Sequence, residues 1–206
     1  KIEEIDLSEK VDVLISEWMG YSLLYEFMLD SIIVARDRYL KPEGVLFPSR
    51  AILKGCLLSS PDFFRSRVEF WTDRHMMLGN IDLSAFAGFA KFCSFREPEV
   101  DFIEPDQMAS DGHVILDLDL KTCTEDNYTN VKKTLTMKSI MHGPLNGVAI
   151  WFDVVFPKEI VLTTSPDCGH QTHWKQTMLF FNDPVEIKQV RLYMITHLHL
   201  LNIAAG

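Results

Sequence analysis

The chain has 206 residues, 47% of them apolar, and a formal net charge of −9. This composition is typical of a globular chain with room for one large or two small domains. The negative charge argues against nonspecific nucleic-acid binding, which depends on lysine and arginine. No apolar run approaches the roughly 20 residues that a membrane-spanning helix needs.

The four cysteines are well separated and form no Cys-x-x-Cys pair: Cys56, Cys93, Cys123 and Cys168. This spacing argues against a secreted disulfide framework and favours a reducing compartment, so we expect a protein of the cytoplasm, the nucleus or both. Cys168, His170 and His173 are three potential zinc ligands within six residues. Zinc needs a fourth ligand, and the other candidates, His197 and His199, are remote in sequence. We therefore predict no metal site.

The first 48 residues have the pattern of an α/β protein. The β-branched run Val11–Ile15 predicts a central strand of a parallel sheet, buried on both faces. Apolar residues at steps of three or four predict a helix over Leu23–Leu40, which Lys41–Gly44 should end. Val45–Pro48 predicts one more short strand. Because so few elements do not make a doubly wound domain, we expect the chain to begin inside one.

From residue 50 on, the pattern changes to short strands separated by turn signals. The segment Asp62–Phe92 is rich in Phe, Met and Ala, and it predicts two short helices joined around Gly79-Asn80. Strands are predicted over Ala51–Leu58, Val114–Leu120, Lys133–Ile140, Val148–Phe156, Ile160–Thr164 and Gln176–Phe181. We expect an antiparallel sheet or barrel with a helical insertion, followed by the apolar tail Val190–Gly206.

Two glutamates, Glu17 and Glu26, flank the loop between the first predicted strand and the predicted helix. Ligands of α/β sheets commonly bind where a strand ends and a helix begins. The glutamates are nine positions apart and converge only if the loop folds back, which Gly20 permits. A guanidinium suits such a pair because it donates hydrogen bonds to both carboxylates. Spacing alone also allows Glu17 to cap the helix and Glu26 to be solvated, and paired glutamates also serve glycosidases.

Two longer runs occur in a fixed order: SEWMGYSLLYEFML over Ser16–Leu29 and THWKQT over Thr172–Thr177. They resemble the double-glutamate loop and the Thr-His-Trp loop of protein arginine methyltransferases. Shorter matches to the same family are Val11-Asp12, Ala35-Arg36-Asp37, Phe47-Pro48 and Thr163–Pro166. The resemblance runs from about Lys1 to Gln189, which is nearly the whole chain.

The resemblance implies transfer of a methyl group from S-adenosylmethionine to a guanidinium nitrogen of a protein arginine, with Glu17 and Glu26 as the catalytic pair. Carboxylates on two edges of a guanidinium orient one nitrogen toward the methyl donor, and one of them can accept the released proton. The resemblance also implies that Met19, Tyr21, His173 and Trp174 bind substrate and that Glu3 and Met28 bind cofactor. Core packing is an equally simple role for Met28. Phe27 departs from the small or polar residue expected there.

The fold implied by the resemblance has two parts. Residues 1–49 would form the C-terminal part of a Rossmann-like cofactor-binding domain that carries the double-glutamate loop. Residues 50–206 would form an antiparallel β-barrel with a helical dimerisation arm over about 61–95. The family's glycine-rich cofactor loop has no counterpart from Lys1 onward, so we expect the chain alone to bind cofactor poorly and to be inactive. The implied partners are Gly/Arg-rich protein substrates and a second copy of the chain, with neither nucleic acid nor a membrane.

A second hypothesis is a noncatalytic module of the same architecture for dimerisation and substrate docking. The predicted helical segment is unusually apolar, with clusters at Phe63-Phe64, Phe70-Trp71, Met76-Met77 and Phe86, Phe89 and Phe92. These side chains either fill the chain's own core or meet a partner.

Overall fold

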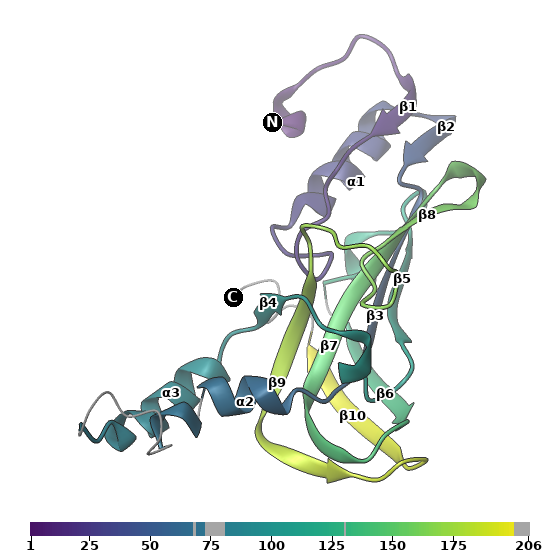
Figure 1. The fold of residues 1–206 in the computed structure, drawn as a ribbon. Coiled ribbons are helices and arrows are strands. Elements are labelled where there is room, and N and C mark those ends of the chain that lie inside the picture. The colour runs from purple at the N-terminus through teal and green to yellow at the C-terminus, as the bar shows by residue number, and fades with distance from the viewer. Residues whose placement is uncertain (68, 73–80, 130, 200–206) are drawn as a thin grey trace.

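The computed structural model describes residues 1–67, 69–72, 81–129 and 131–199. Figure 1 shows a small α/β part that packs against one end of a larger β part. The helices α2 and α3 project sideways from the β part. The chain is therefore organised so that the loop with the two glutamates lies where the α/β part meets the β part.

The α/β part contains a two-stranded parallel sheet and one helix. Strand β1 (Val11–Ile15) pairs with β2 (Leu40–Phe47), and helix α1 (Met28–Tyr39) connects them. The short helix η1 (Ile2–Glu4) packs against α1. The predicted parallel strand is confirmed, but the prediction that both of its faces are buried is wrong, because Val13 is 46% and Ile15 is 74% exposed. Among the described residues, β1 has β2 as its single paired neighbour.

Helix α1 begins at Met28, five residues later than predicted. The residues before it adopt left-handed backbone conformations, with positive φ at Ser22, Leu23, Glu26 and Phe27. Such conformations are uncommon outside glycine and interrupt a right-handed helix. The expected terminator Lys41–Gly44 lies inside β2, since the chain passes directly from helix to strand at Leu40.

The β part is antiparallel throughout its described pairings. A six-stranded sheet has the order β4-β9-β7-β3-β5, with β8 paired to β7. Its strands are β3 (Arg50–Leu58), β4 (Glu99–Asp101), β5 (His113–Asp119), β7 (Gly143–Phe156), β8 (Ile160–Thr163) and β9 (Gln176–Ile187). A second sheet pairs β6 (Lys132–Lys138) with β10 (Leu192–His199). All six predicted strands of this part are confirmed, whereas closure into a barrel stays a prediction.

The helical insertion follows β3. It contains α2 (Pro61–Arg67), η2 (Glu69–Trp71), η4 (Ser84–Phe86) and α3 (Ala87–Ser94). The predicted join at Gly79-Asn80 and the Met76-Met77 pair lie outside the described residues. Single turns of 3₁₀ helix, η5 (Pro105–Gln107), η6 (Glu125–Asn127) and η7 (Pro157–Glu159), lie between strands. Within the described ranges, no helix is both long and apolar enough to cross a membrane.

One apolar core joins the two parts. Strand β7 is buried along nearly its whole length, and Phe152 on it is 1% exposed. The same cluster includes Trp18 and Leu23 from the double-glutamate loop and Leu29 from α1. The loop is therefore packed onto the β part, and movement of its backbone would disturb buried side chains.

A second connection between the parts is polar. Arg36 extends from α1 and donates hydrogen bonds from Nη1 to the carbonyl oxygens of Leu120 (3.0 Å) and Cys123 (2.7 Å). Nearby, the Tyr128 hydroxyl donates to Asp30 on the same helix. These contacts fix the position of α1 on the loop that follows β5, because each ties a side chain of one part to the other.

Replacement of Arg36 by Met should lower the free energy of unfolding by about 2 kcal/mol, since it leaves two carbonyl groups without their charged donor. Arg36 suits this test because its side chain is 10% exposed. Arg65→Met is the control, because the Arg65 side chain is 68% exposed. Urea unfolding of the chain measures both variants. Equal stability of the Arg36 variant and the unmodified chain would show that the contacts contribute nothing.

Candidate active site

The double-glutamate loop is held in shape by its own backbone. Gly20 and Leu23 exchange backbone hydrogen bonds of 3.1 and 3.0 Å, and Ser16 N–H donates to the Phe47 carbonyl at the end of β2 (3.0 Å). A Cβ atom on Gly20 would lie 2.0 Å from the carbonyl oxygen of Tyr25. The loop therefore folds back as expected, and glycine is needed because the Tyr25 backbone passes directly against it.

The two motifs recognised in the sequence meet at one hydrogen bond. The indole N–H of Trp174 donates to the Met19 carbonyl oxygen at 2.7 Å, in a buried position and across 155 positions of sequence. The Trp174 ring also packs edge-on against Phe152 at a centroid distance of 5.5 Å. His173 lies against the Trp174 ring at 3.9 Å and is exposed. The Thr-His-Trp loop therefore supports the backbone of the double-glutamate loop.

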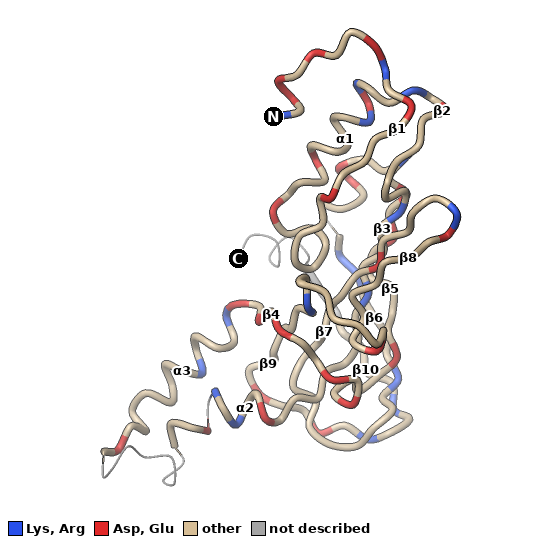
Figure 2. Tube along the Cα trace, turned by 45° about the horizontal axis from the view of Figure 1, so that its top comes forward, with Lys and Arg blue, Asp and Glu red and all other residues tan. Residues whose placement is uncertain are grey.

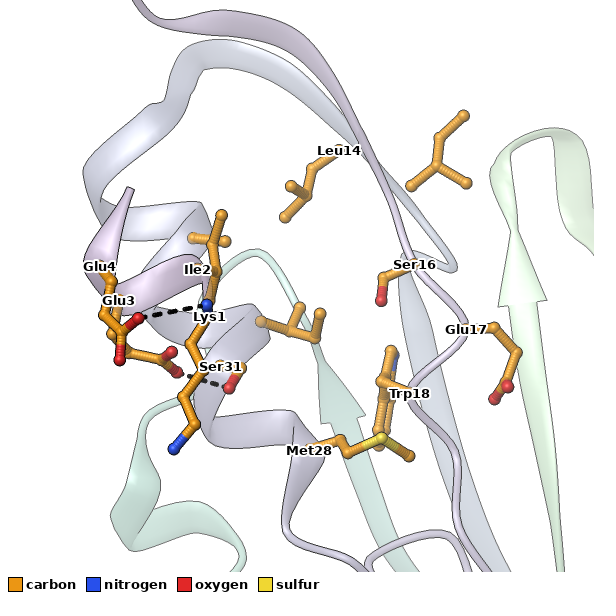
Figure 3. Close-up of a pocket in the computed structure, with 13 residues that line it drawn as sticks. Lys1, Ile2, Glu3, Glu4, Leu14, Ser16, Glu17, Trp18, Met28 and Ser31 are labelled. Atoms are coloured by element: carbon orange, nitrogen blue, oxygen red, sulfur yellow. Dashed lines mark hydrogen bonds and ion pairs between the residues drawn. The ribbon is translucent and has the colours of Figure 1, made fainter. Parts of the chain in front are cut away.

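A cavity of about 730 Å³ lies between the end of β1, α1 and the N-terminal residues. Its walls include Glu3, Glu17, Trp18, Met28 and Ser31, shown in Figure 3. The Ser31 hydroxyl donates to Glu3 at 2.6 Å, and this bond lowers the pKa of the Glu3 carboxyl. The buried indole N–H of Trp18 has no acceptor in the described part of the chain. The cavity thus offers a carboxylate, a hydroxyl and an unused N–H donor to a ligand.

The structure places the two glutamates in different surroundings. Glu17 lines the cavity, and its Oε1 accepts the Met19 N–H at 3.1 Å. In Figure 3 the Glu17 side chain lies on the opposite side of the backbone ribbon from Met28 and Ser31. Glu26 is exposed, has φ of 77°, and does not line this cavity. Both glutamate side chains are exposed, and Glu26 does not line the cavity that Glu17 lines, so their convergence on one guanidinium stays a prediction.

The other predicted site residues are divided between the core and the surface. Glu3 and Met28 both line the larger cavity, and their role in cofactor binding stays a prediction. Met19 is 5% exposed and belongs to the apolar core. Tyr21 lines a second, smaller cavity on another side of the loop. Sequence reasoning missed Ser31, although its place three positions after Met28 puts both on one face of α1.

The absence of a metal site stays a prediction. Within the described ranges, no three side chains of His, Cys, Asp or Glu gather as potential ligands. The Cys168 thiol donates to the His170 carbonyl oxygen at 2.9 Å, a local contact within one turn. All four cysteines are free thiols.

Gly20→Ala should lower the free energy of unfolding by about 1–3 kcal/mol, because the new methyl group overlaps the Tyr25 backbone. Gly88→Ala is the matched control: nothing lies within 4 Å of a Cβ there, and the site is inside α3. That variant should be as stable as the unmodified chain or up to about 1 kcal/mol more stable, since alanine favours helix. Thermal unfolding followed by circular dichroism compares them, and similar melting temperatures would contradict the close approach.

Trp174→Phe should lower the free energy of unfolding by about 1–3 kcal/mol, because the Met19 carbonyl then stays buried without a donor. Trp71→Phe, in η2, is the control, since Trp71 contacts its neighbours only through ring packing in the described residues. Urea unfolding is the measurement. An equal loss in the two variants would mean that ring size, and not the hydrogen bond, connects the two loops.

Comparison with known proteins identifies the β part. Residues 49–197 match the family model described as the arginine methyltransferase oligomerization subdomain. A probable protein arginine N-methyltransferase 6 of Arabidopsis thaliana is 35% identical over 92% of this chain. Protein arginine N-methyltransferase 6 of Xenopus tropicalis is 38% identical over 91% of this chain. The chain spans 51% and 55% of the length of these two relatives.

Solved structures agree with this assignment. A structure of the Trypanosoma brucei PRMT1 enzyme–prozyme heterotetrameric complex with AdoHcy is 30% identical, with a TM-score of 0.81 over 94% of this chain and 59% of its own. Arabidopsis thaliana protein arginine methyltransferase 10 is 31% identical, with a TM-score of 0.73 over 91% of this chain and 60% of its own. The chain belongs to the protein arginine N-methyltransferase family.

Proposed function

We propose that this chain forms the arginine-binding part of an enzyme that transfers a methyl group from S-adenosylmethionine to a guanidinium nitrogen of protein arginine. The observation that carries the proposal is the Trp174–Met19 hydrogen bond, which brings the two sequence motifs together beside the 730 Å³ cavity. The names of the relatives support the activity. The chain spans about half of their length, so the activity of the whole protein is part of the proposal.

The proposed role of Glu17 and Glu26 is to hold a guanidinium by two of its edges. Glu17 Oε2 has no partner among the described residues, so it can accept a guanidinium N–H while Oε1 keeps the Met19 N–H. Glu26 likewise makes no hydrogen bond or ion pair within the described chain. Its left-handed backbone is strained for a residue other than glycine, and such strain is concentrated at functional sites. Substrate binding would then bring the two carboxylates onto one cation, because the cation removes their repulsion.

The cavity fits the cofactor in size and in chemistry. Glu3 presents a carboxylate that can accept from an amino group, Trp18 has an unused buried N–H, and Met28 supplies an apolar wall. When bound, S-adenosylmethionine supplies an electrophilic methyl group. We expect the chain alone to bind it weakly and to be inactive, since these residues provide one side of such a site. The Trypanosoma brucei complex described above contains AdoHcy, which supports this choice of cofactor.

The proposed division into domains is 1–49 and 50–206, with a dimerisation arm over about 61–95. The proposed substrates are Gly/Arg-rich proteins, and the proposed locations are the cytoplasm and the nucleus. A noncatalytic module for dimerisation and substrate docking is the second candidate. It is favoured by the exposed aromatic side chains of the arm, since Phe86, Phe89 and Phe92 are each more than half exposed. At the base of the arm, Phe63 stacks on Phe180 of β9 with a ring-centroid distance of 3.8 Å, so this ring packs against the β part.

Replacement of Glu26 by Gln should lower kcat by at least about 100-fold in a methylation assay with the protein that carries this sequence, because a carboxylate that stabilises the transition state is lost. Glu17→Gln should have a similar effect. Glu125→Gln is the control, since this exposed glutamate lies in η6, away from the loop. Near-normal turnover in both loop variants would refute the proposed roles. Calorimetry that detects no S-adenosylmethionine binding to the same protein would favour the noncatalytic module.

A further inference from the structure

A second cavity, of about 270 Å³, lies on another side of the double-glutamate loop. Its walls come from three places: the loop supplies Tyr21, Ser22 and Tyr25, the segment after α3 supplies Glu97, Pro98 and Val100, and β9 supplies Thr177. None of these residues lines the larger cavity. The loop therefore separates two cavities and forms a wall of each.

Two residues that line this second cavity, Ser22 and Thr177, have buried hydroxyl groups that lack the hydrogen bonds such groups normally have. Ser22 is 9% exposed and Thr177 is 2% exposed. Neither Ser22 Oγ nor Thr177 Oγ1 has a partner within the described ranges. An unsatisfied buried polar group destabilises a fold, and native structures contain few of them. Two such hydroxyls in one small cavity point to a polar ligand that satisfies them.

The charge of the cavity indicates the sign of that ligand. Acidic residues gather around β4, as Figure 2 shows. Glu99 pairs with Arg67 at 2.9 Å, and Asp101 pairs with Lys175 at 2.9 Å. Glu97 lines the cavity but forms no ion pair or hydrogen bond with any described residue. Glu97, which has no cationic partner among the described residues, is thus the carboxylate that lines the cavity, and its charge favours the binding of a cation.

We propose that this second cavity binds a basic side chain of the same polypeptide whose arginine enters the candidate active site. The inference rests on the proposed function for the identity of that polypeptide. Glu97 would pair with the cation, the hydroxyls of Ser22 and Thr177 would accept its N–H groups, and the rings of Tyr21 and Tyr25 flank a cation favourably. The volume suits one extended side chain.

Because the double-glutamate loop forms a wall of both cavities, one polypeptide can reach both. Glu17 and Trp18 line the larger cavity, and Tyr21, Ser22 and Tyr25, three to eight positions later, line the smaller one. A polypeptide that crosses the loop can place one side chain on each side of it. A second contact of this kind raises affinity because it forms within an already bound chain.

Methyl resonances can report on each cavity separately. The chain is labelled with ¹³C at the methyl groups of Met, Val and Thr, and it is titrated with n-butylguanidinium or with the neutral n-butylurea. Met28 reports on the larger cavity, and Val100 and Thr177 report on the smaller one. We expect n-butylguanidinium, but not n-butylurea, to shift the Val100 and Thr177 resonances. No such shift, or an equal shift with the urea, would overturn the proposal.

Two carboxylate variants test the role of charge. Glu97→Gln should weaken the titration at Val100 and Thr177 by at least about tenfold, since a charge-assisted hydrogen bond is lost, and should leave the titration at Met28 unchanged. Glu186→Gln is the control, because Glu186 is an exposed glutamate on β9 that lines neither cavity. Equal weakening in the two variants would show a general effect of charge and would refute a site at Glu97.

The titration also separates this proposal from the proposed function. Shifts at Val100 and Thr177 without a shift at Met28 would leave the second cavity standing and count against an arginine site beside Glu17. The reverse pattern would refute the second cavity alone. A peptide with two arginines should shift all three methyl groups at lower concentration than the same peptide with one arginine replaced by citrulline, and equal affinities would refute simultaneous binding.

Thr177→Val tests whether the hydroxyl serves a ligand or the fold. The valine variant removes an unsatisfied buried hydroxyl, so its melting temperature should equal or exceed that of the unmodified chain. Its affinity for n-butylguanidinium should fall. A lower melting temperature would show that the hydroxyl has a structural role, and an unchanged affinity would show that it does not contact the cation. Either result would count against the site as proposed.

Discussion

The hydrogen bond from the Trp174 indole to the Met19 carbonyl is the interaction on which the site depends. It fixes the backbone of the double-glutamate loop at a point between Glu17 and Gly20. Gly20 in turn allows the Tyr25 backbone to lie against it, which places Glu26 and the start of α1. The backbone that leads to Glu26 is thus supported by a tryptophan in the loop between β8 and β9. Such long-range support is how a binding loop becomes preorganised.

Much of the β part could be predicted from sequence because its strands are short apolar runs with turn signals on both sides. The start of α1 could not. Its apolar periodicity extends back to Leu23, but positive φ at Ser22, Leu23, Glu26 and Phe27 interrupts the helix there. Gly20 signals that the loop folds back, but the tertiary contact with Trp174 that supports the loop has no local signal. Strand β10 was also missed, since the apolar tail contains no turn residue that marks where it begins.

Prediction of the candidate site from the sequence was limited in the same way. Glu3 and Met28 could be placed together because the resemblance to the family assigned both to the cofactor, and the structure has them in one cavity. The second cavity was invisible in the sequence, since Tyr21, Glu97 and Thr177 are separated by more than 70 positions at each step. Spacing can suggest that one loop carries two carboxylates. It does not show which side chains from elsewhere complete the walls around that loop.

Because β1 pairs with β2 alone among the described strands, the parts of this chain should unfold in a definite order. A two-stranded parallel sheet has little stability of its own, and Val13 and Ile15 are largely in water. The stability of this sheet therefore depends on α1, whose Arg36 is hydrogen-bonded to the β part. Strands β3 and β7, in contrast, are central in their sheet and buried. In this chain taken by itself, local unfolding should thus begin at β1 and α1 and stop at the double-glutamate loop, which lies at the border between a less stable and a more stable region.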